Sequence, residues 1–304
     1  MRNFKSMSMS KFRKIGLVGR PDHSGVVTSL EKLVSYLDSK AVSIVADAAT
    51  AALMKNVTLE VVPKTDLGDS CDLVIVVGGD GSILNIAKYV LSTKVPVIGV
   101  NRGKLGFLTD ILPDEIESKL DDVLSGACSL EERFLLDIYL LGSDERKYLG
   151  SALNDVVLHP GSAAQMTEFE LFIDDVFVYS QESDGLIVAT PTGSTAYALS
   201  AGGPIMHPSL DAMVLAPMYP HSLSSRPVVV GGDSQIKLTI PSTGSRQPQI
   251  SCDGDLKYSA NGGDQFLITK KTVPLHLIHP PGHSFYEACR SKLGWGSRLV
   301  KKND

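Results

Sequence analysis

Cysteine is scarce in this sequence, and its spacing excludes the usual structural uses of thiols. The 304 residues hold four cysteines, no two of which form a Cys-x-x-Cys pair: Cys71, Cys128, Cys252 and Cys289. Neither a disulfide framework nor a cysteine-based zinc site is therefore expected. We interpret the four residues as reduced thiols that serve as small apolar side chains.

Histidine is also infrequent, and its one cluster is not spaced for a metal. The stretch "HLIHPPGH" contains His276, His279 and His283. His276 and His279 are three positions apart in a strand-like segment, so they face opposite sides of a strand with a period of two residues. We interpret the cluster as structural or surface histidines.

The chain has no excess of positive charge and no long apolar run. Its net charge is −5 at pH 7, which argues against a surface that binds nucleic acid through counterion release. No apolar run approaches the ~20 residues that cross a bilayer, and "MRNFKSMSMSKFRK" lacks the apolar centre of a secretory signal. We therefore expect a cytoplasmic protein without nucleic acid or membrane partners. An anionic ligand would need local amides, local cations or a metal.

The first third of the chain alternates strand-like and helix-like segments. Short apolar runs at 14–19, 41–47 and 71–79 are separated by a helical stripe that starts at Val26. The segment "SILNIAKYVLS" has helical spacing, with Ser82 as a possible N-cap. This alternation predicts a Rossmann-like α/β domain with a parallel sheet covered by helices on both faces.

The pattern changes near residue 130. Short strand candidates follow one another, separated by Gly, Pro, Asn, Asp and Ser, with few helical stripes between them. This pattern predicts an all-β, sandwich-like second domain. We expect the α/β domain at residues 11–128 and the β-rich domain at 129–285. The last segment, 286–304, would pack back on the first domain.

The stretch "VVGGDGSIL" places Asp80 among glycines between a predicted buried strand and a predicted helix. Glycines permit close approach of a ligand to the backbone, and a helix start offers unpaired N–H groups to phosphate. A carboxylate repels phosphate, so Asp80 is useful there only as a metal ligand or as a proton acceptor for an attacking hydroxyl. An aspartate in a plain glycine-rich turn is the alternative.

Three further stretches carry polar side chains next to predicted strands. "NRGKLGFLTD" supplies Arg102 and Lys104 near the same sheet edge. "ALNDVVLH" supplies Asn154 and Asp155, an amide suited to a base edge and a carboxylate suited to ribose hydroxyls. The run "TGSTAYALSAGG" from Thr192 offers hydroxyls, amides and one aromatic ring to a nucleotide. For each stretch, an ordinary surface loop remains an alternative.

Taken in order, these stretches together with "PHSLSSRPVVV", "ISCDG" and "KLGWGSRLV" resemble the NAD kinase family, particularly its bacterial members. The resemblance extends from about residue 14 to 300. "GGDG" alone is shared with lipid kinases of the diacylglycerol type, whereas the Thr-Gly-Ser-Thr-Ala-Tyr run joined to the Asn-Asp pair is more specific. The resemblance implies the two domains described above.

The resemblance also implies an activity. Such enzymes transfer the γ-phosphoryl group of ATP, with a divalent cation (Mg²⁺ or Mn²⁺), to the 2′-hydroxyl of the adenosine ribose of NAD, which gives NADP. They assemble as homodimers or homotetramers. Two other functions remain open from the motifs: a lipid kinase with the same loop, and a non-catalytic regulator that binds dinucleotides.

Site residues follow from the resemblance position by position. Asp80 matches the family's candidate general base, and the motifs assign no metal ligand. The NAD pocket implied by the resemblance comprises Asp80, Gly81, Asn154, Asp155, Asp184, Thr195, Ala196, Tyr197, Ala198, Leu199 and Ser200. Phe107, Gln165, Glu182, His221 and Asp255 are secondary candidates for the same pocket. Gly79, Arg102 and Lys104 are the candidates for the phosphates of ATP. Glu182, Gln165 and Asp255 differ from the residues common in bacterial relatives.

Overall fold

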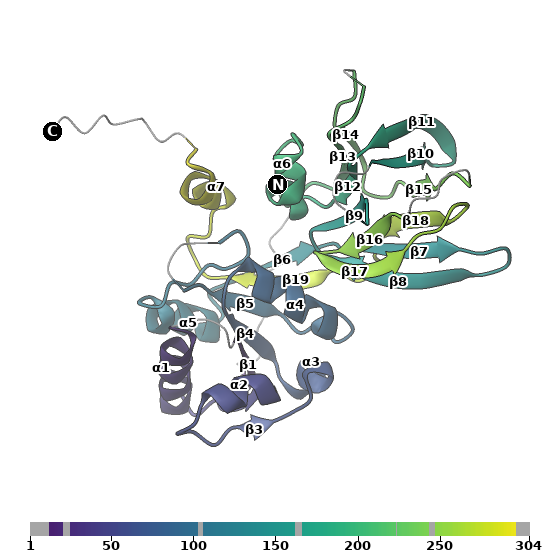
Figure 1. The fold of residues 1–304 in the computed structure, drawn as a ribbon. Coiled ribbons are helices and arrows are strands. Elements are labelled where there is room, and N and C mark those ends of the chain that lie inside the picture. Colours follow the sequence, from purple (N-terminus) through teal and green to yellow (C-terminus); the bar gives the residue numbers. More distant parts are fainter. Residues whose placement is uncertain are drawn as a thin grey trace, which may run out of the picture. The chain divides into compact units, whose positions relative to one another are not determined.

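The computed structural model describes residues 12–20, 25–102, 106–161, 166–222, 224–242 and 247–295. The chain forms two compact units (Figure 1). The first unit comprises Met1–Glu132 and Leu275–Asp304, and the second comprises Arg133–Pro274.

A seven-stranded sheet forms the centre of the first unit. Its order is β3-β2-β1-β4-β5-β19-β6, and the pairs from β3 to β19 are parallel. The strands are β1 (Lys14–Gly19), β2 (Ser43–Ala46), β3 (Glu60–Val61), β4 (Leu73–Val77), β5 (Val97–Val100), β6 (Ser129–Arg133) and β19 (Leu275–His279). The chain runs from β1 to β2 on one side and later to β4 on the other, so β1 and β4 flank a topological switch point. In open α/β sheets, ligands bind at the carboxyl ends of the strands at such a point.

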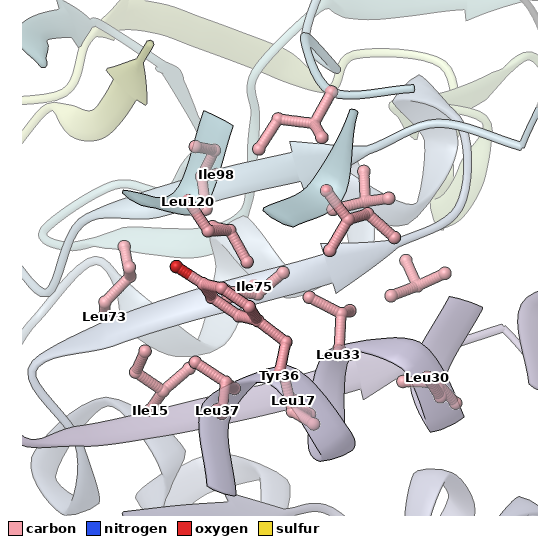
Figure 2. Close-up of a cluster of buried hydrophobic side chains, with 14 of the residues drawn as sticks. Ile15, Leu17, Leu30, Leu33, Tyr36, Leu37, Leu73, Ile75, Ile98 and Leu120 are labelled. Carbon is pink, nitrogen blue, oxygen red and sulfur yellow. The ribbon is translucent and has the colours of Figure 1, made fainter. Parts of the chain in front are cut away.

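The helices of this unit are α1 (Val26–Ser39), α2 (Ala48–Leu53), α3 (Leu67–Ser70), α4 (Asp80–Val90), α5 (Ile116–Ser125) and α7 (Phe285–Leu293), with the 3₁₀ turn η1 (Lys64–Asp66). Figure 2 shows Leu30, Leu33 and Leu37 of α1 against strand residues such as Ile15 and Ile75. All five are fully buried, and each contributes about 1.5–3 kcal/mol relative to an exposed side chain.

Helix α4 begins earlier than the sequence pattern suggests. Asp80 is its first residue and Gly79 its N-cap, whereas Ser82 was the expected cap. Gly79 has extended backbone geometry without a side-chain cap, so the chain turns into the helix directly from β4. Asp80 consequently lies in the first turn, where the helix dipole favours a negative charge.

Two strands beyond the predicted α/β segment complete the seven-stranded sheet. The expected division at 128/129 and 285/286 places β6 and β19 in the β-rich part, but in the structure both belong to the seven-stranded sheet. Strand β19 pairs in parallel with β5 and is buried along most of its length. A short strand buried in this way carries too few polar positions for its sequence alone to reveal its partner.

The second unit is a sandwich of two six-stranded sheets, in the orders β11-β10-β15-β18-β7-β8 and β14-β13-β12-β9-β16-β17. The strands are β7 (Leu136–Leu141), β8 (Arg146–Ala152), β9 (Asp155–His159), β10 (Thr167–Ile173), β11 (Val176–Ser183), β12 (Gly185–Ala189), β13 (Ala212–Met218), β14 (Val228–Gly231), β15 (Ile236–Thr239), β16 (Gln249–Cys252), β17 (Asp255–Ser259) and β18 (Gln265–Lys270). One apolar core joins inward residues of both sheets, including Phe169 and Phe266 of the first and Leu186 and Ile250 of the second.

The outer face of the second sheet is covered by the segment after β12, which contains η2 (Gly193–Thr195) and α6 (Tyr197–Ser200). An α/β unit followed by a β-sandwich, with the C-terminal helix α7 returning to the first unit, confirms the predicted fold class. Among the described helices, none is both long and apolar enough to span a membrane.

Candidate active site

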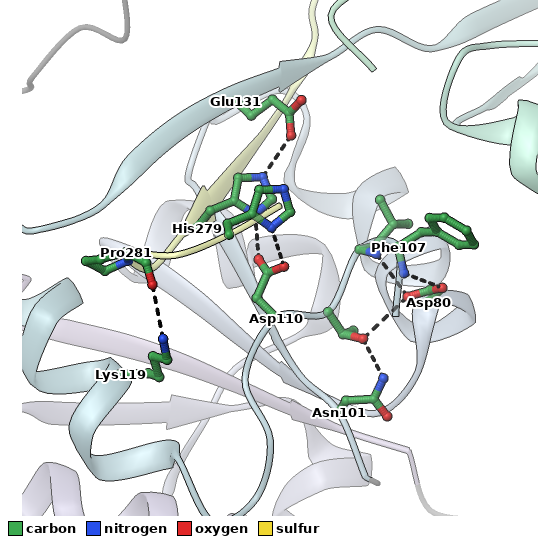
Figure 3. Close-up of polar contacts among 11 residues, drawn as sticks. Asp80, Asn101, Phe107, Asp110, Lys119, Glu131, His279 and Pro281 are labelled. Carbon is green, nitrogen blue, oxygen red and sulfur yellow. Dashed lines mark hydrogen bonds and ion pairs between the residues drawn. The ribbon is translucent and has the colours of Figure 1, made fainter. Parts of the chain in front are cut away.

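Asp80 is held by the loop that follows β5. The Phe107 N–H donates to Asp80 Oδ2 at 3.0 Å, the Leu108 N–H donates to Oδ1 at 3.0 Å, and the Thr109 hydroxyl lies 3.4 Å from Oδ1 (Figure 3). These bonds fix the orientation of the carboxylate. Since each carboxylate oxygen can accept two hydrogen bonds, Oδ2 keeps one lone pair for a ligand hydroxyl.

The loop that holds Asp80 is itself constrained. Asn101 is buried at the end of β5, and its Nδ2 donates to Thr109 Oγ1 at 2.7 Å. A Cβ at Gly106 would overlap both Asp80 Oδ1 and Thr109 Oγ1, whereas a Cβ at Gly81 would have nothing within 4 Å. Glycine at 106 is therefore required by the protein's own packing, while the space beside Gly81 is open to a ligand.

The two glycines give contrasting predictions. Gly106→Ala should displace the Asp80 carboxylate and lower both the melting temperature and kcat, the latter by about 10–100-fold. Gly81→Ala should raise the unfolding free energy by up to about 1 kcal/mol, because alanine is the better helix former. It should still lower activity, because the new methyl group projects into the open space. Thermal unfolding and steady-state kinetics of both variants check this contrast. If Gly81→Ala had the same kcat and KM as wild type, Gly81 would not line the ligand site.

A cavity of about 320 Å³ lies at the switch point, beside the start of α4. Its polar lining residues follow the ends of β1 and β2 or belong to η1 and α4: Arg20, Asp47, Lys64, Ser82 and Asn85. Lys64 Nζ donates to Asn85 Oδ1 at 2.7 Å and lies 3.9 Å from Asp47 Oδ2. Ser82 Oγ is buried and makes no hydrogen bond within the described residues. A phosphate oxygen or a metal-bound water in this cavity would satisfy that hydroxyl.

Arg102, one of the predicted phosphate ligands, lies at the same sheet edge. It follows Asn101, whose Oδ1 accepts a bond from the Arg102 backbone N–H at 2.6 Å. Its Nε is buried without a hydrogen-bond partner among the described residues. Gly79 is the N-cap of α4. Lys104, the other predicted cation, lies outside the described residues.

Four ionisable side chains gather on the other side of the same loop. Asp110 accepts hydrogen bonds from His279 Nδ1 at 2.5 Å and from His283 Nδ1 at 2.8 Å, and His279 Nε2 bonds Glu131 Oε2 at 2.8 Å (Figure 3). The two imidazole rings stack with centroids 3.8 Å apart. Burial opposes a charge on His279, but the two carboxylates outweigh it and raise the pKa of His279 to about 8.

This network does not suit the metal of a phosphoryl transfer. Asp110, His279 and His283 offer ligand atoms within 4.8 Å of one another, but those atoms hydrogen-bond each other. Two imidazoles would also be unusual ligands for Mg²⁺, which prefers oxygen donors. The interpretation of His279 and His283 as structural histidines therefore fits the geometry, although His279 is an internal ion-pair partner rather than a surface residue.

In the second unit, Asn154 and Asp155 lie at the start of β9 in a segment clamped by Asp253. The carboxylate of Asp253 accepts the backbone N–H groups of Leu153 (2.9 Å), Asn154 (2.8 Å) and Asp155 (3.2 Å). Asp253 has a left-handed φ of 50° in the turn between β16 and β17. The position of the predicted nucleoside-binding pair thus depends on a side chain about one hundred residues away in sequence.

The segment from Thr190 to Ser194 is built mainly to support that pair. Thr190 Oγ1 donates to the Leu153 carbonyl at 2.6 Å, and Gly193 packs so closely on Asn154 that a Cβ would overlap its backbone. Arg133 donates to the Thr192 hydroxyl at 3.2 Å, and Ser194 Oγ donates to the Pro191 carbonyl at 2.7 Å. The Ser194 hydroxyl is fully buried and has an internal role. The Thr192 hydroxyl accepts from Arg133 and keeps its own O–H group, so its contact with a ligand stays a prediction.

The other predicted residues of the second unit differ in exposure. Tyr197 and Ser200 are exposed and line a cavity of about 430 Å³ together with Arg226. The remaining predictions fall into three classes: Ala198 is fully buried, Thr195, Ala196, Leu199 and Asp184 are half-buried, and Glu182, His221 and Asp255 are exposed. In the first unit, Phe107 is half-buried. Gln165 lies outside the described residues.

Asp155 gives a prediction on stability and pH. Burial, and then the charge of Asp253, raises the pKa of Asp155 from 3.8 to about 7. Between about pH 4 and pH 7 the folded chain keeps a proton on Asp155 that the unfolded chain has released. Asp155 therefore lowers the free energy of unfolding as the pH rises from about 4 to about 7, and above about pH 7 it causes no further change with pH. Urea unfolding at several pH values should show a shallower decline for Asp155→Asn than for wild type. Identical slopes would contradict the raised pKa.

Two family models match the chain in sequence order. The ATP-NAD kinase N-terminal domain matches residues 15–128, and the ATP-NAD kinase C-terminal domain matches residues 153–280. The chain belongs to the ATP-NAD kinase family. This result confirms the family and the enzyme class that the motifs predicted.

Relatives in the NAD kinase family span almost the whole chain. An NAD kinase of Teredinibacter turnerae is 52% identical over 289 residues, covering 95% of this chain and 99% of that protein. An NAD kinase of Marinobacter nauticus is 54% identical over 292 residues, covering 96% and 99%. Yeast NADH kinase complexed with NADH has a TM-score of 0.87 at 26% identity, covering 96% of this chain and 91% of that chain. An NAD kinase from Archaeoglobus fulgidus in complex with ATP has a TM-score of 0.70 at 25% identity, covering 92% and 97%.

Several residues that shape this NAD kinase site escaped the sequence-based prediction. Asp253 was not among the predicted site residues, and Arg20, Asp47 and Lys64 carried no motif. One signal was available for Arg20 and Asp47, because Arg20 directly follows the predicted strand at 14–19 and Asp47 is the last residue of the strand-like run at 41–47. The carboxyl ends of parallel strands form the edge at which ligands bind. No local signal distinguishes Asp253, since its partners belong to a distant segment.

Proposed function

We propose that this NAD kinase transfers the γ-phosphoryl group of ATP to the 2′-hydroxyl of the adenosine ribose of NAD⁺, giving NADP⁺ and ADP. The observation that carries the proposal is the Asp80 carboxylate, which is oriented by the amides of residues 107 and 108 and retains accepting capacity on Oδ2. The ribose oxygen attacks the γ-phosphorus, the bond from that phosphorus to the β,γ-bridging oxygen breaks, and ADP leaves. Asp80 accepts the hydroxyl proton.

Positioning and charge neutralisation supply most of the catalysis, because the transition state of phosphoryl transfer is loose. We assign the phosphates of ATP to the start of α4, with Gly79 at its N-cap, Gly81 in its first turn and Arg102 nearby. Arg20 and Lys64 add positive charge from the lining of the switch-point cavity. The ATP complex of the Archaeoglobus fulgidus relative supports ATP as the donor.

A divalent cation, Mg²⁺ or Mn²⁺, fits the chemistry of this cavity. Mg²⁺ is commonly held by one or two carboxylates, waters and substrate phosphates. The cavity offers the Asp47 carboxylate and the unsatisfied hydroxyl of Ser82, and we assign the metal to these residues. When bound, the cation would neutralise charge on the phosphates.

We assign the nucleoside part of NAD to the second unit. Asn154 presents an amide for a base edge, and Asp155 presents a carboxyl group for ribose hydroxyls. Tyr197 and Ser200 supply an exposed ring and hydroxyl beside a cavity. The NADH complex of the yeast relative, whose fold matches over most of this chain, supports a dinucleotide ligand.

An enzyme-coupled assay tests the proposal. The purified chain is incubated with ATP, Mg²⁺ and NAD⁺, and NADP⁺ is measured with an NADP-specific dehydrogenase. We expect NADP⁺ formation that requires all three components, and no phosphorylation of diacylglycerol in a parallel reaction. NAD⁺ binding without NADP⁺ formation would instead favour the non-catalytic regulator, and diacylglycerol phosphorylation would favour the lipid kinase.

The family resemblance supports two further assignments. We propose that the chain forms a homodimer or homotetramer and acts in the cytoplasm. Light scattering coupled to size-exclusion chromatography distinguishes the two assemblies from a monomer, and fractionation of the source cells locates the enzyme.

A further inference from the structure

The loop of residues 106–110 connects two polar networks. On one side, the Phe107 and Leu108 N–H groups hold Asp80. On the other side, the Asp110 carboxylate accepts bonds from His279 and His283. Because Leu108 and Asp110 are only two residues apart, a change in the position of Asp110 is transmitted to the amides that orient Asp80.

His279 is the centre of the second network. It lies at the end of β19, its side chain is 2% exposed, and its two ring nitrogens bond the carboxylates of Asp110 and Glu131. An imidazole that donates from both nitrogens is the charged form. The Asp110 side chain is 6% exposed, so its negative charge depends on this cation for compensation inside the protein.

The turn after β19 is also fastened. His283 bonds Asp110 Oδ1, and Lys119 Nζ on α5 donates to the Pro281 carbonyl at 3.0 Å (Figure 3). Three elements distant in sequence, β6, α5 and β19, therefore contribute to the network around Asp110, on the side of the loop opposite Asp80. None of these side chains reaches the Asp80 carboxylate directly in the hydrogen bonds described.

We propose that His279 and Asp110 are positioning residues for the reaction, which set the orientation of the Asp80 carboxylate by anchoring the loop of residues 106–110. The inference rests on the proposed function, in which Asp80 accepts the proton of the ribose hydroxyl. Small misplacements of reacting groups are costly, since an error of about 1 Å can lower a rate by about 100-fold. Loss of this anchor should thus lower kcat more than it affects substrate binding.

The principal test is His279→Gln, with His276→Gln as the matched control. His276 lies on the same strand, bonds the Lys94 carbonyl and has no bond to the 106–110 loop in the structure. We expect His279→Gln to lower kcat by about 10–100-fold and to leave the KM for NAD⁺ within about threefold of wild type. His276→Gln should keep the wild-type kcat.

A double variant separates positioning from a general loss of structure. If His279 acts through Asp80, then His279→Gln should lower kcat little further in an Asp80→Asn background, within about twofold, because coupled residues are not additive. Additive losses would overturn the proposal, as would a wild-type kcat for His279→Gln. If that variant does not fold, His283→Gln removes only one of the two bonds to Asp110 and should give a smaller fall in kcat, with the same coupling to Asp80.

The pH profile offers a second kinetic readout. His279 faces Asp110 of the loop, Glu131 of β6 and the stacked ring of His283. The cavity that Asp110 and His283 border is also lined by Glu115 at the N-cap of α5, Lys119 of α5 and Glu287 of α7. Its pKa is raised to about 8, so its ion pairs are complete below about 6.5 and are lost as the pH rises through about 8. Wild-type kcat should decline through that range, and His279→Gln should lack this decline. Equal profiles would count against the proposal.

A readout that needs no catalysis distinguishes the failure of this proposal from the failure of the proposed function. Hydrogen exchange of the Phe107 and Leu108 amides reports the bonds to Asp80 directly. We expect faster exchange at both amides in His279→Gln and unchanged exchange in His276→Gln. If the wild-type chain forms no NADP⁺, then the proposed function fails. The exchange rates of the two amides would still show whether His279 controls the loop that holds Asp80. Unchanged exchange in His279→Gln would overturn the link itself.

Discussion

Asp80→Asn should reduce NADP⁺ formation by about 1,000-fold, within the range by which a positioned general base accelerates a reaction. The amide cannot take the hydroxyl proton, so the loss should appear in kcat rather than in NAD⁺ binding. The substitution also affects the loop, because the new NH₂ group would face a backbone N–H of residue 107 or 108 in place of an accepting oxygen. A control must therefore separate lost basicity from a displaced loop.

Gly106→Ala supplies that control. It displaces the Asp80 carboxylate by steric overlap but keeps an aspartate, and therefore a basic group, at position 80. If displacement of the loop explained the whole loss in Asp80→Asn, then the two variants would have similar kcat values. The proposed base role requires Asp80→Asn to be slower than Gly106→Ala by at least about tenfold. Retention of more than about a tenth of wild-type kcat by Asp80→Asn would exclude that role.

Asp253→Asn should have the largest effect on the second unit. The Asp253 carboxylate accepts three backbone N–H groups, and hydrogen bonds to charged groups contribute about 1.5–3 kcal/mol each. Asparagine also tolerates a left-handed φ, so the substitution tests the carboxylate rather than the turn. We expect a fall of about 2–4 kcal/mol in the free energy of unfolding and a KM for NAD⁺ at least about tenfold higher, because Asn154 and Asp155 lose their support.

Asp233→Asn is the matched control, since the Asp233 side chain is 88% exposed and lies 3.3 Å from Lys270 Nζ in a surface ion pair. Surface substitutions of this kind change stability by about 0.5 kcal/mol or less. Loss of the Asp253 charge should also bring the pKa of Asp155 closer to its ordinary value, because that charge contributes to its elevation. Urea unfolding and NAD⁺ kinetics of both variants check these effects. Equal stability of the two variants would show that Asp253 does not clamp the segment.

The parts of the fold that could be predicted from sequence were those with local periodicity. Strand β4 and helix α4 show buried-strand and helical patterns on either side of Asp80, so the position of that carboxylate at the sheet edge followed from the pattern. The alternation of short strands likewise indicated a sandwich before its pairing was known. These features depend on side chains near each other in sequence.

The remaining features depend on contacts between distant segments. Strand β19 joins a sheet whose other strands end at residue 133, and Asp110 meets His279 across 169 positions. The spacing of His276 and His279 predicted that the two face opposite sides of a strand, but it could not show that Asp110 and Glu131 bond His279. Asp253 and Gly193 support Asn154 in the same long-range manner. Periodicity identifies which residues are buried and leaves their partners undetermined.

The identity of the phosphorylated hydroxyl tests the proposed reaction most directly. The wild-type chain is incubated with Mg²⁺ and ATP labelled in the γ-phosphate, with either NAD⁺ or the NAD⁺ analogue that lacks the 2′-hydroxyl on its adenosine ribose. We predict that the label enters NAD⁺ as a 2′-phosphate monoester and that the analogue remains unlabelled. Label in the analogue, or in any other position of NAD⁺, would contradict a site built to direct Asp80 at that hydroxyl.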